Sequence, residues 1–130
     1  MTLALDTSIL IDLQNRVSST LEKLGTLAKE HPAPARITFM NYVEFLYGLE
    51  NKNVKNKQAA LELLNNFMIV HTSTNAARVM VKLKHKYDQK GLQIALADLL
   101  IASIVIEQNL TLITKDTDFA RIEELQKIII

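Results

Sequence analysis

Short apolar runs alternate along this chain with longer segments of helical periodicity, and this alternation limits the fold more than any other feature. The runs are too short to be helices, so they predict strands. Strands that alternate with helices predict a parallel sheet covered by helices on both faces. We therefore expect an α/β fold, a three-layer α/β/α sandwich around a mostly parallel sheet. The expected strands are residues 3–5, 35–39, 68–70, 112–114 and 128–130.

The helical segments carry apolar residues at spacings of three and four positions, which places those residues on one face. Thr7 or Ser8 is expected to cap the first helix and Asn41 the third. Gly91 is expected to end the fifth, because glycine tolerates the left-handed conformation that often closes a helix. The expected helices are residues 9–13, 18–30, 42–49, 58–67, 75–90 and 98–108.

The most apolar stretch, residues 94–106, contains Asp98 and is shorter than the roughly 18 residues that a membrane span needs. It predicts a buried helix in the middle of the fold. The first residues lack the basic segment of a secretory signal. We therefore expect a cytoplasmic protein with no membrane segment.

The composition excludes several kinds of chemistry. The chain has 130 residues, which is the size of one domain, so we expect a single domain over residues 1–130. It has no cysteine, which excludes disulfides, thiolate zinc sites and cysteine nucleophiles. It has only three histidines, which argues against a histidine-rich metal site. A chemical site in this chain must therefore rely on other side chains.

Acidic residues occur where an open α/β sheet places its ligands, beyond the carboxyl ends of the strands. Asp6 follows the first strand, and Asp116 and Asp118 follow the strand at residues 112–114. Glu44 lies one turn into the helix after the second strand, and Asp98 lies in the first turn of the apolar helix. Acids from four separate segments are therefore expected to meet at one edge of the sheet.

Each acid also has a structural interpretation when it is taken alone. Asp98 favours the positive end of its helix, Asp6 can cap a helix, and Asp116 and Asp118 are turn formers. Glu44 is harder to explain this way, because apolar residues flank it and a lone buried carboxylate is costly.

Converging carboxylates repel one another and raise one another's pKa, and a divalent cation removes that repulsion. An all-carboxylate site suits Mg²⁺ or Mn²⁺ rather than Zn²⁺. Such an ion can activate water for attack on phosphorus and neutralise the charge that develops there. The pattern therefore predicts a metal-dependent site for phosphate chemistry.

Four motifs, in order and from end to end of the chain, resemble those of the PIN-domain ribonucleases, above all the VapC-type toxins of toxin–antitoxin pairs. They are LDTSILIDL, NYVEFLYGLE, ALADLLIAS and LTLITKDTDFARI. Each motif is weak alone, and the set of four at these spacings is specific. Residues 52–90 carry no motif that matches the family.

The resemblance implies Mg²⁺- or Mn²⁺-dependent endonucleolytic cleavage of RNA, a homodimer, and inhibition by a small antitoxin protein. It implies catalytic roles for the quartet Asp6, Glu44, Asp98 and Asp116, with metal binding by Asp6, Asp98 and Asp116. Asp118 supports or replaces Asp116 in many members, and here the closer ligand of the two stays open. Small hydroxyl residues are implied in supporting roles that orient carboxylates or water: Thr7, Ser8 and Thr114.

Other functions remain as alternatives. The same fold serves nucleases of RNA processing that have no antitoxin, and an inert binding module is a further alternative. Aspartyl-phosphate phosphotransferases need a second aspartate two residues after the first, where this chain has Ser8. Receiver domains need an acid pair before the first turn and a phospho-acceptor on a middle strand, and neither is present here.

The formal net charge of +1 does not exclude a nucleic-acid partner. Setting aside the five acids of the predicted site leaves nine acidic residues against 15 basic ones, a charge of +6. The lysines at positions 52, 55 and 57 could contact phosphates, but a solvated turn and helix face explains them better. Asp12 follows Asp6 by six residues, past the first strand, and is expected on the surface.

Overall fold

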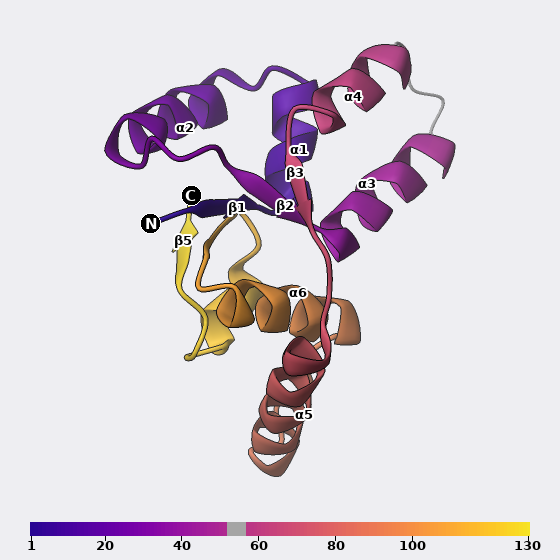
Figure 1. Cartoon of the computed structure of the whole chain (residues 1–130), viewed down its shortest axis with the longest axis vertical. Coiled ribbons are helices and arrows are strands. Elements are labelled where there is room, and N and C mark those ends of the chain that lie inside the picture. The colour runs from indigo at the N-terminus through magenta and orange to yellow at the C-terminus, as the bar shows by residue number, and fades with distance from the viewer. Residues whose placement is uncertain (52–56) are drawn as a thin grey trace.

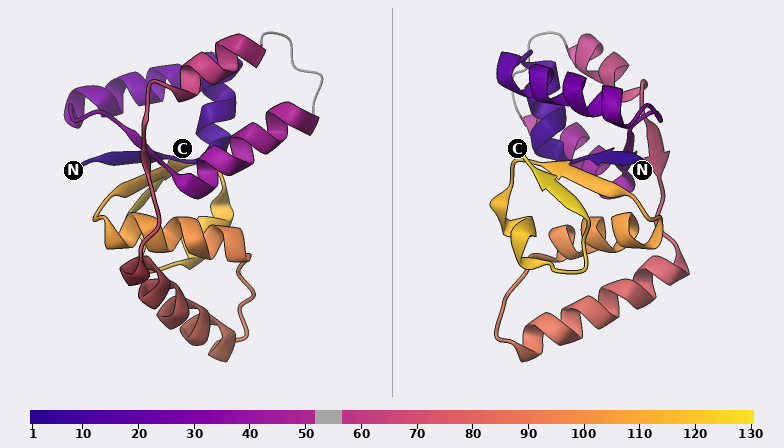
Figure 2. Two further views of the ribbon diagram at one scale, coloured as in Figure 1. Left: turned by 45° about the vertical axis from the view of Figure 1, so that its right-hand side comes forward. Right: turned by 90° about the vertical axis from the view of Figure 1, so that its left-hand side faces the viewer.

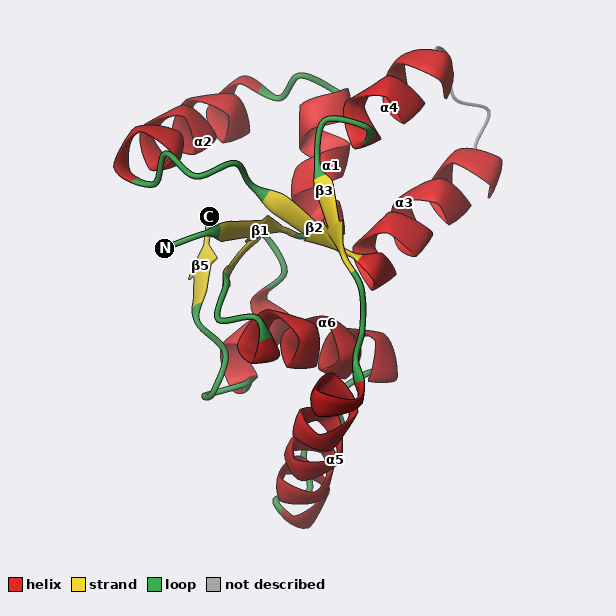
Figure 3. Ribbon diagram, viewed as in Figure 1, coloured by secondary structure: helices red, strands yellow, loops and turns green. Residues whose placement is uncertain are grey.

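A computed structural model describes residues 1–51 and 57–130, and these form a five-stranded sheet between two layers of helices (Figures 1 and 3). Every neighbouring pair of strands is parallel, and the strand order is β3-β2-β1-β4-β5. The expected three-layer α/β/α sandwich is confirmed. The strands are β1 (Leu3–Leu5), β2 (Arg36–Thr38), β3 (Met68–Val70), β4 (Thr111–Thr114) and β5 (Lys127–Ile129).

Helices lie on both faces of the sheet (Figure 1). On the first face lie α1 (Thr7–Gln14), α2 (Ser18–Glu30), α3 (Phe39–Asn51) and α4 (Lys57–Leu64). On the second face lie α5 (Thr74–Gln89) and α6 (Leu96–Glu107), and a 3₁₀ helix, η1 (Thr117–Arg121), follows β4.

Alternate side chains of the central strands pack into two separate hydrophobic cores, because successive residues of a strand point to opposite faces of the sheet. In β1, Leu3 and Leu5 join the core under α1–α4, whereas Ala4 joins the core under α5 and α6. In β4, Ile113 joins the first core and Leu112 the second. The sheet is thus held from both sides.

Helix α6 lies between the sheet and α5, as the two views of Figure 2 show. This position explains why the helix is apolar nearly all round. Buried residues lie on several of its sides, including Leu99, Ile101 and Ile104. The expectation of a helix in the middle of the fold is confirmed.

The strand order reverses direction between β1 and β4. After β1, the chain adds β2 and β3 on one side of the sheet, and β4 then returns to the other side of β1. Leu5 pairs with Ile113, and the backbone N–H of Asp6 donates to the carbonyl oxygen of Ile113 at 3.0 Å. The carboxyl ends of β1 and β4 therefore lie together at a topological switch point, where open α/β sheets bind ligands.

The helix caps differ from those expected. Asp6, rather than Thr7 or Ser8, occupies the N-cap position of α1, and its side chain makes no capping hydrogen bond. Phe39 begins α3 instead of ending the strand before it. The hydroxyl of Thr38 accepts the backbone N–H of Asn41 at 3.1 Å, so Thr38 caps α3 in place of Asn41. The polar side chains of Thr7, Ser8 and Asn41 are thereby available for other contacts.

Asp12 is buried, with 8% of its surface exposed, so the expectation that it lies on the surface is wrong. Its carboxylate accepts hydrogen bonds from the hydroxyl of Thr20 on α2 and from Nζ of Lys115 after β4. These two hydrogen bonds hold the pKa of Asp12 below its usual value. The buried charge is tolerated because it is paired and hydrogen-bonded.

Within residues 1–51 and 57–130, no helix is both long enough and apolar enough to cross a membrane. Of the three lysines considered for phosphate contacts, Lys52 and Lys55 lie outside the described residues. Lys57 begins α4, and its Nζ lies 3.9 Å from Oε1 of Glu50.

The central position of α6 predicts a large cost for truncating a side chain on it. Ile104 is fully buried, so Ile104→Ala is expected to lower the free energy of unfolding by about 2–5 kcal/mol. Val81 on α5 is 69% exposed, and Val81→Ala should change it by less than about 0.5 kcal/mol. Urea unfolding followed by circular dichroism measures both, and equal effects would contradict the buried position of α6.

Candidate metal centre

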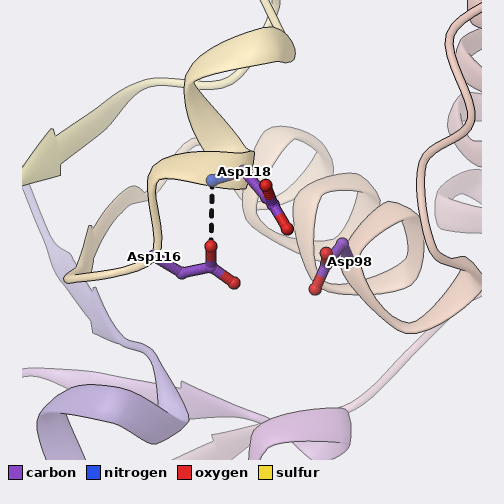
Figure 4. A group of neighbouring side chains, drawn as sticks. All are labelled: Asp98, Asp116 and Asp118. Atoms are coloured by element: carbon purple, nitrogen blue, oxygen red, sulfur yellow. Dashed lines mark hydrogen bonds between the residues drawn. The ribbon is translucent and has the colours of Figure 1, made fainter.

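Three carboxylates come together beyond the carboxyl end of β4 (Figure 4). Asp98, Asp116 and Asp118 each offer one oxygen, and these three oxygens lie within 4.8 Å of one another. Asp98 comes from the first turn of α6, while Asp116 and Asp118 come from the start of η1 on the facing loop. We call these three residues the carboxylate triad.

Asp116 is held by hydrogen bonds on both sides of its position in the chain. Its backbone N–H donates to the hydroxyl of Thr114 at 3.0 Å, and its Oδ1 accepts the backbone N–H of Asp118 at 2.9 Å (dashed in Figure 4). The side chain therefore caps η1, as its interpretation as a turn former suggests. The same bond fixes the carboxylate in the triad.

Asp6 is buried beside the triad and accepts three hydrogen bonds. Nδ2 of Asn41 donates to Oδ1 of Asp6 at 2.8 Å. The hydroxyls of Thr114 and Ser8 donate to Oδ2 at 2.7 and 3.2 Å. Both oxygens of this buried carboxylate therefore have hydrogen-bond donors. Because Thr114 also accepts the N–H of Asp116, it links Asp6 directly to the triad.

Glu44 is attached to the same network on the side of α3. The hydroxyl of Thr7 donates to Oε1 of Glu44 at 2.7 Å. Nδ2 of Asn41 lies 3.4 Å from that oxygen and 3.0 Å from the hydroxyl of Thr7. Each of the three predicted supporting hydroxyls, those of Thr7, Ser8 and Thr114, donates to one of the predicted acids.

Asn41 is the residue of this network that the sequence analysis missed as part of the site. The hydroxyl oxygen of Thr38 accepts the backbone N–H of Asn41. The hydroxyl proton of Thr38 is donated to Oδ1 of Asn41 at 2.7 Å. This bond directs the amide nitrogen toward the carboxylates of Asp6 and Glu44. The available signal was its spacing: Asn41 precedes Glu44 by three residues, which places both on one face of the helix.

The other four predicted acids all act on the carboxyl group of Asp98. The pKa of Asp98 is raised from 3.8 to about 6, first by burial and then by the negative charges of Asp116, Asp6, Glu44 and Asp118. The structure thus gathers every predicted acid at one edge of the sheet. Asp98, Asp116 and Asp118 form the triad, and Asp6 and Glu44 lie in the adjoining hydrogen-bond network.

The triad fits a hard divalent cation. Its donors are carboxylate oxygens alone, which Mg²⁺ and Mn²⁺ prefer. A cation would offset the repulsion that, after burial, raises the pKa of Asp98. Both Asp116 and Asp118 belong to the triad, so the structure gives no reason to choose only one of them.

The raised pKa of Asp98 predicts how stability depends on pH without metal. The folded chain binds the Asp98 proton more tightly than the unfolded chain, so stability is lost as pH rises from about 4 to about 6. In EDTA, Asp98→Asn is expected to raise the Tm at pH 7.5 and to have little effect at pH 4. Thermal unfolding across this pH range measures the difference, and a pH-independent shift would contradict the prediction.

Comparisons with known proteins agree with this geometry. The family model of the PIN domain matches residues 3–125. Ribonuclease VapC2 of Rickettsia felis (strain ATCC VR-1525 / URRWXCal2) is 33% identical over 125 residues, which cover 93% of this chain and 92% of that protein. The similarity therefore extends over nearly the whole length of both chains.

Solved structures show the same fold. The structure of VapBC2 from Rickettsia felis bound to a DNA fragment from their promoter contains a chain of 30% identity, with a TM-score of 0.87. The alignment covers 100% of this chain and 99% of that one. A toxin–antitoxin complex from Klebsiella pneumoniae contains a chain of 27% identity, with a TM-score of 0.74 and coverage of 96% and 95%. With a family model that matches residues 3–125 and a VapC relative similar over nearly its full length, the chain belongs to the PIN-domain family, among its VapC-like members.

Proposed function

We propose that residues 1–130 form a single divalent-metal-dependent endoribonuclease domain that acts as the toxin of a toxin–antitoxin pair. The observation that carries this proposal is the gathering of five acids at the switch point of the sheet, three of them with oxygens within 4.8 Å. Membership of the PIN-domain family and the similarity to a protein named Ribonuclease VapC2 support the same activity.

In this proposal Asp98, Asp116 and Asp118 hold Mg²⁺ or Mn²⁺, with Asp6 as a further ligand. A bound cation supplies positive charge that activates water and stabilises the charge developing on the phosphodiester. Asp6 accepts three hydrogen bonds from Asn41, Ser8 and Thr114, which fix the direction of its remaining lone pairs. The site is therefore organised before substrate arrives, which is what electrostatic catalysis requires.

Glu44 is proposed to accept a proton from the attacking water. Thr7 and Asn41 both donate to Oε1, which leaves Oε2 to accept a proton or to bind water beside the cation. As one proton of the water passes to Glu44, the water oxygen bonds to phosphorus, the bond to one bridging oxygen breaks, and that oxygen takes up a proton from solvent water. The supporting residues Thr7, Ser8 and Thr114 orient the acids and do not themselves react.

The proposed partners are RNA, an antitoxin protein and a second copy of the chain. The charge of +6 that remains outside the five acids suits contact with RNA phosphates. The solved chains of 30% and 27% identity described above come from a VapBC2 structure and a toxin–antitoxin complex, which supports an antitoxin partner here. A homodimer is proposed from the resemblance to the family.

Substitution of the acids tests the catalytic proposal. Asp6→Ala, Glu44→Ala and Asp98→Ala are each expected to lower RNA cleavage by about 100-fold or more, the scale on which single electrostatic groups act at a reacting centre. EDTA should abolish cleavage by the native chain, and Mn²⁺ should restore it. Asp88→Ala is the matched control, because Asp88 pairs with Lys84 on the exposed surface of α5.

Circular dichroism separates catalytic from structural roles for the acids. Variants that stay folded but do not cleave support the proposal, whereas variants that all lose their fold would show that the acids are structural. A native chain that is not stabilised by Mn²⁺ and cleaves no RNA would support an inert binding module instead.

Co-expression distinguishes a toxin from a nuclease of RNA processing. The product of a small gene directly upstream is expected to co-purify with the chain and to suppress its cleavage of RNA. If the chain cleaves RNA and that product neither binds nor inhibits it, the processing nuclease is the better description. Sequencing of the cut RNA from cells with and without the partner measures both the activity and its target.

A further inference from the structure

We propose that Lys115 is a positioning residue: together with Ser8, Asp12 and Thr20 it forms a clasp that holds Asp116 and Asp118 beside Asp98 before a cation binds. This inference rests on the proposed metal site. The clasp lies outside the carboxylate triad, and its residues connect α1 and α2 to the loop after β4. None of the roles assigned above accounts for Asp12, Thr20 or the side chain of Lys115.

Helix α1 holds Lys115 at two points. The backbone N–H of Lys115 donates to the hydroxyl of Ser8 at 3.1 Å. Its Nζ donates to Oδ2 of Asp12 at 2.8 Å, more than a turn farther along the same helix. The hydroxyl of Thr20 donates to that same oxygen and brings in α2. Both the backbone and the side chain of one loop residue are therefore fixed.

The burial of Asp12 makes this clasp more than a surface ion pair. The side chain of Asp12 is 11% exposed, whereas that of Lys115 is 44% exposed, so the lysine reaches inward to a carboxylate that has little access to water. An exposed ion pair exchanges readily with water. A buried carboxylate that loses its cation keeps the full cost of its desolvation. Release of Lys115 is therefore strongly disfavoured.

The position of Lys115 in the chain transmits this restraint to the triad. In the sequence, Lys115 lies between Thr114 and Asp116. The hydroxyl of Thr114 donates to Asp6 and accepts the backbone N–H of Asp116. Without a cation, the charges of Asp116 and Asp118 repel that of Asp98 on α6. The clasp attaches the loop to α1, so the repulsion must strain the Asp12–Lys115 pair before Asp116 and Asp118 can move away. Groups that orient ligands in this way commonly change metal affinity by about 10- to 100-fold.

The test compares Lys115→Ala, Asp12→Asn and the double variant with the native chain. Mn²⁺ affinity is measured by calorimetry, and hydrogen exchange of the backbone amides of Lys115 and Asp118 is measured in EDTA. Each single variant is expected to weaken Mn²⁺ binding by about 10-fold and to speed exchange at both amides. The double variant should be no weaker than the singles, since either change opens the same clasp. Lys115→Arg should restore most of the affinity.

Lys84→Ala is the matched control. It also removes a lysine from an ion pair, of 2.9 Å, but that pair lies on the exposed surface of α5. Mn²⁺ affinity and amide exchange at Lys115 and Asp118 should stay at native values. If Lys115→Ala fails to fold, Thr20→Val, which removes one hydrogen bond to Asp12 and keeps the charges, replaces it with the same expected direction.

Two results would overturn the proposal. Lys115→Ala with native Mn²⁺ affinity and native amide exchange, but a raised KM for RNA, would make Lys115 a substrate contact. Additive effects of the two substitutions would mean that Asp12 and Lys115 act separately. A native chain that binds no Mn²⁺ would refute the proposed metal site alone, and the exchange rates in EDTA would still decide whether the clasp holds the loop.

Discussion

Mutual repulsion among carboxylates is the constraint on which the rest of this structure depends. Five acids meet at one edge of the sheet, and the pKa of Asp98 is raised first by its burial and then by the negative charges of the other four. Hydrogen-bond donors directed at the carboxylates stabilise two of these acids. Asn41, Thr114 and Ser8 all donate to Asp6, and Thr7 donates to Glu44. Side-chain donors thus serve Asp6 and Glu44, whereas in the triad of Asp98, Asp116 and Asp118 the backbone N–H of Asp118 donates to Asp116.

The fold supplies the rigidity that such a site needs. Strands β1 and β4 are neighbours in the sheet, and each sends alternate side chains into cores on opposite faces. Helix α6, which carries Asp98, is packed between the sheet and α5. Well-packed elements resist small displacements, so the acids on α6 and after β1 keep their positions although their charges repel. The short loop after β4 is the part that needs separate anchoring.

The organisation of the site explains how a nearly neutral chain would suit the RNA substrate proposed for it. The acids are concentrated at the switch point, where a cation would offset them, and the rest of the chain carries an excess of basic residues. The similarity to Ribonuclease VapC2 and to a chain of the VapBC2 structure extends over nearly the whole sequence, including the described residues 57–90, which carry no recognisable motif.

The sequence by itself determined the parallel sheet, its two helical layers and the five acids. Periodicity and the ends of strands can be read locally, and in a parallel sheet the carboxyl ends of all strands lie at the same edge. The bounds of α2 and β3 and the buried position of α6 also followed from local patterns. Only the tertiary structure decided that Asp12 is buried, that Asn41 bridges Asp6 and Glu44, and that Lys115 reaches α1. These contacts join residues as much as 103 positions apart. A polar side chain at a helix end can either cap the helix or join a buried hydrogen-bond network. Only the packing of α1 and α3 against the loop after β4 decides between these two roles.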